Sequence, residues 1–156
     1  MNQDKIHFRA FLLLCRQNGI TVWADRHLMK TKQTSGHWNG FDHISIYRET
    51  IKSDQVGILP GHSSEKKIEE FIADSPNIKW EMAILLHEYG HWCHKHPHLN
   101  QVDSVTSYKQ EVEAWEKGEE IGRSLGMQDF AVFYAEREKA LHGYRVGLRL
   151  EPASQE

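Results

Sequence analysis

The sequence predicts a mostly helical α+β domain with a small sheet towards its N-terminal half. Several stretches repeat apolar residues at helical spacing, while one alternates them as a strand does. The 156 residues suffice for one core but not for two, and 39% hydrophobic with 26% charged residues is typical of a folded chain. We expect a single domain over residues 1–150 and a flexible tail at 151–156.

The first half of the chain predicts one helix and two strands. Residues 4–17 have the pattern of a helix, which Asn18 and Gly19 end. Ile20 to Trp23 can begin a short strand. In residues 41–47, Ile44 and Ile46 fall on one face, as in a half-buried strand. The stretch 51–66, with two glycines and a proline, is expected to be a loop or an insertion.

The second half predicts helices only. Ser75 and Pro76 resemble a helix start, with serine as the cap, and Pro97 ends the helix that follows. Asp129 can cap the last helix. In order, we expect a short helix over 68–73, a helix over 78–95, a polar connection over 99–107, a helix over 108–125 and a last helix over 129–142.

Composition excludes several classes of function. The net charge of −3 argues against a dedicated nucleic-acid surface. The apolar run 10–15 is too short for a secretory signal, and no stretch reaches the roughly 20 apolar residues that span a bilayer. Cys15 and Cys93 form no disulfide framework. We therefore expect a cytoplasmic protein without a membrane partner.

Residues 87–91 read His-Glu-Tyr-Gly-His and carry the chemistry. On a helix, positions i and i+4 share one face, so His87 and His91 can bind a single ion. Zinc suits two neutral imidazoles and a carboxylate, with a fourth position left for water. Glu88 projects one residue further round, where it can take a proton from that water. The apolar turns before His87 favour a helix buried beneath an active site.

Helical spacing selects Glu111 as the third ligand. Between residues 111 and 125, the apolar face comprises Ala114, Trp115, Gly118, Ile121, Gly122 and Leu125. Glu111 extends this face by one turn, whereas Glu113, Glu116, Lys117 and Glu120 fall on the opposite, solvated face. A carboxylate at the end of a buried stripe must be paired, protonated or bound to a metal. Small residues at 114, 118 and 122 also let two helices approach closely.

Other residues have more than one interpretation. His142, Tyr144 and Tyr108 are candidates for the donor that stabilises the oxyanion. His94 is expected to line the cleft, with metal binding as the alternative, and His96 is expected to be an exposed loop residue. The strand at 41–47 is either an ordinary sheet strand or one that pairs with an extended substrate.

The motif His87-Glu88-Tyr89-Gly90-His91, with Glu111-Val112-Glu113-Ala114 downstream, resembles the gluzincin group of zinc peptidases. Within that group the chain is most similar to the ImmA/IrrE-type metallopeptidases, including the Gly-Ile-x-Val stretch at 19–22. The resemblance implies a zincin-like fold, zinc at His87, His91 and Glu111, and Glu88 as the base. It also implies a protein substrate, often a DNA-binding repressor, which is cleaved by Glu-assisted attack of a zinc-bound water.

The chain departs from that family at Trp115, where Asn or Asp is usual after the alanine. The residue that orients a metal-binding histidine is then expected elsewhere, with Asp103 and Glu119 as candidates. Two other functions remain open. One is a zinc-peptidase toxin or effector, and the other is a metal-binding sensor module without essential catalysis.

Overall fold

The computed structural model describes residues 2–32, 34–97 and 103–149, and within them the protein is a mostly helical α+β fold. The helices are α1 (Gln3–Gln17), α2 (Leu28–Thr31), α3 (Glu65–Ala73), α4 (Ile78–His94), α5 (Ser104–Ser124) and α6 (Ala131–Gly147). The strands are β1 (Thr21–Asp25), β2 (Gly36–Trp38), β3 (His43–Tyr47) and β4 (Gln55–Ile58). The predicted tail at 151–156 lies outside the described residues. None of the described helices is long and apolar enough to cross a bilayer.

The sheet is mixed, with the strand order β2-β3-β1-β4. β1 is parallel to β3, while β4 and β2 are antiparallel to β1 and β3 respectively. The strand expected at 41–47 is confirmed as β3, with Ile44 and Ile46 buried. The prediction of a loop over 51–66 was wrong, because β4 lies within it and pairs with β1. Its short run of Gln-Val-Gly-Ile gave too little alternation to indicate a strand.

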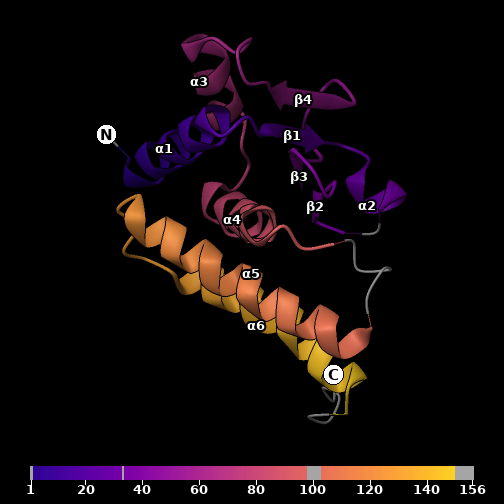
Figure 1. The fold of residues 1–156 in the computed structure, drawn as a ribbon. Helices are drawn as coiled ribbons and strands as arrows, with labels where there is room; N and C mark the ends of the chain where they lie inside the picture. The colour runs from indigo at the N-terminus through magenta and orange to yellow at the C-terminus, as the bar shows by residue number, and fades with distance from the viewer. Residues whose placement is uncertain (1, 33, 98–102, 150–156) are drawn as a thin grey trace.

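α4 lies between the sheet and the pair formed by α5 and α6 (Figure 1). Residues 81–86 at its centre are buried all round, so this helix is the core of the molecule. A bidentate ion pair fixes it to the sheet side: Arg48 Nε and Nη2 donate to the Glu81 carboxylate at 2.9 and 2.6 Å. Both side chains are fully buried, and Arg48 also lies over the Phe71 ring.

The helix ends differ in detail from those predicted. The cap of α4 is Asn77, whose side chain accepts from the Trp80 backbone N–H, and not Ser75. Asp103 caps α5 through the Thr106 N–H, so this helix begins one turn before the predicted start at Tyr108. α6 continues five residues beyond His142, because the helix passes through Gly143 without a break.

Two glycines bring α4 and α5 into backbone contact. A Cβ added at Gly90 would overlap the carbonyl oxygen of Ala114. A Cβ at Gly118 would lie 2.9 Å from the carbonyl oxygen of Leu86, which is closer than real Cβ atoms approach. The expected approach of two helices at Gly118 is therefore confirmed. Gly122 instead faces Phe130 and Met127, beyond the crossing.

We predict that Gly90→Ala destabilises the protein by about 1–3 kcal/mol, because the added methyl must push two helix backbones apart. Gly143→Ala is the matched control, since nothing lies within 4 Å of its Cβ position. There alanine should stabilise the helix by about 0.5–1 kcal/mol. Urea unfolding of the two variants measures the difference. Equal free energies of unfolding would contradict the close contact of α4 and α5.

Candidate metal centre

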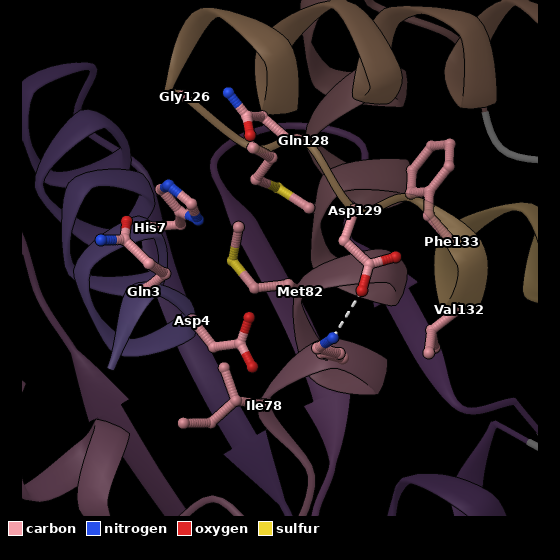
Figure 2. A pocket seen from close by; sticks show the side chains of 12 residues that line it. Gln3, Asp4, His7, Ile78, Met82, Gly126, Gln128, Asp129, Val132 and Phe133 are labelled. Atoms are coloured by element: carbon pink, nitrogen blue, oxygen red, sulfur yellow. Dashed lines mark hydrogen bonds and ion pairs between the residues drawn. The ribbon is translucent and has the colours of Figure 1, made fainter. Parts of the chain in front are cut away.

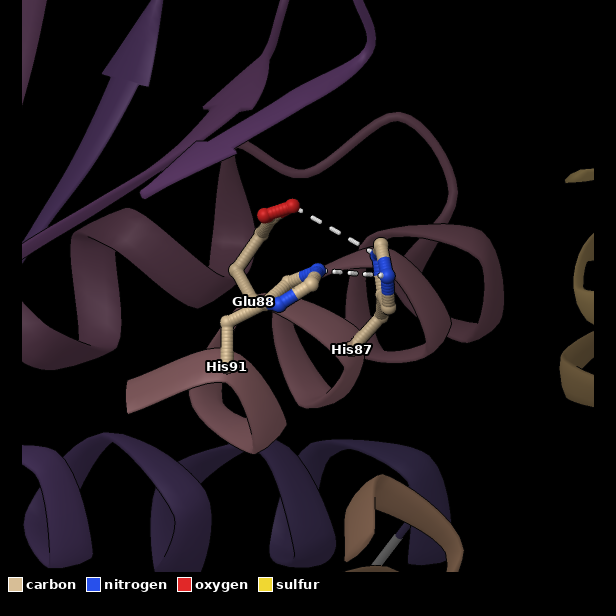
Figure 3. A group of neighbouring side chains, drawn as sticks. All are labelled: His87, Glu88 and His91. Carbon is tan, nitrogen blue, oxygen red and sulfur yellow. Dashed lines mark hydrogen bonds and ion pairs between the residues drawn. The ribbon is translucent and has the colours of Figure 1, made fainter. Parts of the chain in front are cut away.

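His87, Glu88 and His91 project from one side of α4 towards the space below the sheet (Figure 3). The imidazoles approach each other through their Nε2 atoms, which are 3.1 Å apart. Glu88 approaches the other ring nitrogen of His87, with Oε1 3.4 Å from Nδ1. This is the arrangement expected from the spacing of the motif on a helix.

Glu111 comes from α5 and meets both imidazoles. Its Oε2 is 2.7 Å from His87 Nε2, and its Oε1 is 3.0 Å from His91 Nε2. The Glu111 side chain is only 6% exposed. Glu113, by contrast, is half-buried and points towards His94 and His96. Glu111, the residue selected by helical spacing, therefore lies against both imidazoles, in the position that a third ligand would need.

These donors fit a zinc ion. Ligand atoms on a tetrahedral zinc lie about 3.3 Å apart, given metal–ligand distances of about 2.0–2.2 Å. The two Nε2 atoms are 3.1 Å apart, and each lies 2.7–3.0 Å from a different oxygen of Glu111, so the three side chains need only small shifts to admit the ion. His87, Glu88 and His91 are also near enough to share a metal. However, Glu88 faces Nδ1 of His87, whereas the converging atoms are the two Nε2, which Glu111 faces.

The two carboxyl groups have opposite ionisation. Burial would raise the pKa of Glu111, but the adjacent His87 and His91 outweigh it and hold this pKa well below its usual range. Burial raises the pKa of Glu88 to about 7, against the opposing pull of His91 and with help from the Glu111 charge. In the metal-free protein, the lowered pKa of Glu111 favours its ionised form, while the pKa of Glu88 lies near neutral pH.

His91 is oriented by His96, a residue to which the sequence assigned no role in the centre. The Nδ1 atoms of the two rings are 2.9 Å apart, and His96 Nε2 lies 3.3 Å from Glu113 Oε2. His96 is buried, so the prediction of an exposed loop residue was wrong. Burial lowers its pKa, which favours the neutral ring. No periodicity signals this contact, because His96 follows the end of α4.

The expected orienting residues Asp103 and Glu119 are both used elsewhere. Asp103 caps α5, and the Glu119 carboxylate pairs with Arg123 and Arg137. That prediction was therefore wrong. Trp115 instead supports His87 from the side: its ring stacks on His87 with centroids 4.2 Å apart and planes 10° apart. A flat apolar surface thus holds the His87 ring where a hydrogen bond was expected.

A cavity of about 210 Å³ opens beside His87 and Glu88. One wall is the segment Thr34–Gly36, and the opposite wall is formed by Trp115 and residues of α6. Gly36 leaves room for Glu88, because a Cβ there would lie 3.3 Å from Glu88 Cγ and would overlap Ile84. Edge strand β2 therefore borders the carboxylate directly.

The alternative that β3 pairs with a substrate was wrong, because β2 and β1 already occupy both of its sides. Within the described sheet, the strand with an open edge beside the metal centre is β2. Gly36 lies opposite Ile46 in the β2–β3 pair, and its carbonyl oxygen accepts a hydrogen bond from the Thr34 hydroxyl.

Of the candidate oxyanion donors, Tyr144 is close enough to Glu111 and Glu88 to be affected by the charges of both. Burial raises the pKa of Tyr144, and the charges of Glu111 and Glu88 raise it further, so its hydroxyl keeps its proton. Its ring packs 6.3 Å from that of Tyr108, one turn before Glu111. His142 lies two residues before Tyr144 on α6, and such residues point in roughly opposite directions on a helix.

A separate cavity of about 510 Å³ lies between α1, the start of α4 and the connection from α5 to α6 (Figure 2). An ion pair from Lys79 Nζ to Asp129 crosses its edge at 2.6 Å. His7 and Met82 also line it, but no residue of the metal centre does. This cavity therefore plays no part in the chemistry of the centre.

No protein-family model, curated protein or solved structure matches the chain. The geometry of the centre must therefore carry the functional argument by itself.

We predict that the metal-free protein loses stability relative to Glu88→Gln as pH rises. The raised pKa means that the folded state keeps the Glu88 proton between about pH 4.5 and 7, where the unfolded state releases it. The free energy of unfolding of the native protein therefore falls relative to that of Glu88→Gln through this window, by up to about 3 kcal/mol. Urea unfolding of both proteins with a chelator, at pH 4.5, 6 and 8, measures this. A constant difference would show that Glu88 has an ordinary pKa.

Proposed function

We propose that the protein is a zinc-dependent endopeptidase that hydrolyses a protein substrate. The observation that carries this proposal is the convergence of two imidazoles and a buried carboxylate at one point, with a second carboxyl group, Glu88, beside a cavity. Zinc, when bound by His87, His91 and Glu111, activates water for attack on an amide and polarises the carbonyl. We assign the fold as zincin-like on the same grounds.

Glu88 acts as the general base. Its carboxylate borders the cavity, so it can accept a proton from an attacking water and deliver it to the leaving nitrogen. A pKa of about 7 in the metal-free protein suits a group that must both take and release a proton at neutral pH. Glu111 is unsuited to this role, since its two oxygens already contact the His87 and His91 imidazoles.

An extended segment of the substrate would lie along β2. Adding a strand there would place a peptide carbonyl beside Glu88, because Gly36 contacts that side chain. The Tyr144 hydroxyl would donate a hydrogen bond to the carbonyl oxygen as negative charge develops. A regulatory protein, such as a DNA-binding repressor, is the substrate class implied by the likeness to ImmA/IrrE-type metallopeptidases. Cys15 and Cys93 are free thiols, which fits the proposed cytoplasmic location.

Glu88→Gln should retain zinc and fold but lower hydrolysis by about 10²–10⁴-fold, because an amide cannot accept the proton. Glu116→Gln, on the exposed side of α5, is the matched control and should hydrolyse as the native protein does. Mass spectrometry of a denatured-protein library, with each zinc-loaded variant, measures cleavage. Equal cleavage by native protein and Glu88→Gln would exclude the general-base role. No metal-dependent cleavage by the native protein would favour a metal-binding sensor.

Tyr144→Phe should lower kcat/KM by about 10²-fold with little change in zinc affinity, since only the donor hydroxyl is lost. His142→Gln, on the same helix, should have a small effect. Steady-state kinetics on a peptide identified from the library measures both. The reverse ranking would assign the oxyanion role to His142.

A further inference from the structure

A second group of metal-binding side chains lies at the end of α4. His94 Nδ1 is 3.7 Å and His96 Nε2 is 3.3 Å from the same oxygen, Glu113 Oε2. The two rings are stacked, with planes 10° apart and centroids 5.0 Å apart. Two imidazoles and one carboxylate are the same donor set as in the first centre. All three ligand atoms lie within 4.8 Å of one another, and the two distances to the carboxylate are near the separation of about 3.3 Å that zinc requires.

A left-handed turn after α4 creates this group. Lys95 has φ 53°, and the turn is closed by hydrogen bonds from His96 N–H to His91 O and from Lys95 N–H to Trp92 O. These are the two bonds of a Schellman motif, which folds the chain back over the last helical turn. His96 is thereby buried against His91, while His94 and Lys95 stay at the surface. A left-handed conformation is unfavourable for lysine, so the turn is held by its surroundings.

The two centres differ in how exposed their ligands are, and this predicts which binds metal more tightly. The side chains of His94 and Glu113 are 39% and 45% exposed, against 12% and 6% for His87 and Glu111. Exposed side chains keep more rotamer freedom and lose more entropy when a metal fixes them. The outer group should therefore bind metal more weakly than the buried one.

A hydrogen bond between His91 and His96 joins the two groups. When His91 binds a metal through Nε2, its proton must be on Nδ1, and His96 Nδ1 must accept it. The His96 proton is then on Nε2, where it can be donated to Glu113. A metal on His96 Nε2 would move that proton to Nδ1, directly opposite the Nδ1 proton of His91. Both rings cannot donate across the same 2.9 Å.

We propose that His94, His96 and Glu113 form a second, weaker zinc site whose occupancy opposes metal binding at His87, His91 and Glu111. The second site does not depend on the proposed peptidase activity. The weakening of the first site by the second requires only that the first site binds metal, because the two sites are coupled through the tautomer of His91. By reciprocity, each ion weakens the other by the same factor.

Calorimetric titration of the untagged chain with Zn²⁺ tests the second site. We expect one tight site and one at least about 10²-fold weaker. Glu113→Gln should remove only the weak site, because its amide oxygen can still accept the His96 Nε2 proton and keep His91 oriented. Glu116→Gln is the matched control and should retain both. A single site in the native chain, or loss of the tight site in Glu113→Gln, would overturn the proposal.

Glu111→Gln tests the coupling. Weakening the buried centre frees the tautomer of His91, so the site that Glu113→Gln removes should bind Zn²⁺ about tenfold more tightly in Glu111→Gln than in the native chain. Unchanged affinity there would overturn the coupling. Neither titration measures hydrolysis, so both results remain interpretable if the peptidase proposal fails. The titrations test the two metal sites whether or not the protein is a peptidase.

Discussion

The candidate metal centre depends on the close contact between the backbones of α4 and α5. Gly90 lies between His87 and His91 on α4, and its missing side chain lets the Ala114 carbonyl approach. Glu111 precedes Ala114 by one turn, so the same contact sets its carboxylate against both imidazoles. A larger residue at position 90 would separate the helices and leave a buried carboxylate without partners, which is a costly arrangement.

Near this contact, Glu88 and Glu111 differ in their pKa because different groups surround them. Glu111 faces the imidazole nitrogens and remains ionised. Glu88 is adjacent to His87 in the chain but is buried against Gly36 and Ile84, where its proton is retained until about pH 7. The difference between the proposed ligand and the proposed base therefore follows from their positions on two helices and from the cover that β2 provides.

Much of this arrangement could be predicted from the sequence because it rests on helical periodicity. The spacing of His87 and His91, and the position of Glu111 at the end of an apolar stripe, are both properties of a regular helix. Helical spacing also predicted α1 and the close packing at Gly118, and the alternation of Ile44 and Ile46 predicted β3.

The remaining features depend on contacts between segments that are far apart, or on irregular backbone. β4 exists because β1 offers it a partner, and Gly36 matters only because β2 crosses above Glu88. The position of His96 follows from a left-handed residue, Lys95, where a glycine would have been the usual signal. Trp115 was assigned to the apolar face, but nothing in the sequence indicated that its ring would support His87.

Zinc anomalous diffraction from crystals grown with one equivalent of the metal would test the central claim most directly. We expect one strong peak, about 2.0–2.2 Å from His87 Nε2, His91 Nε2 and a Glu111 oxygen. A peak among His94, His96 and Glu113, with none at the buried centre, would contradict it.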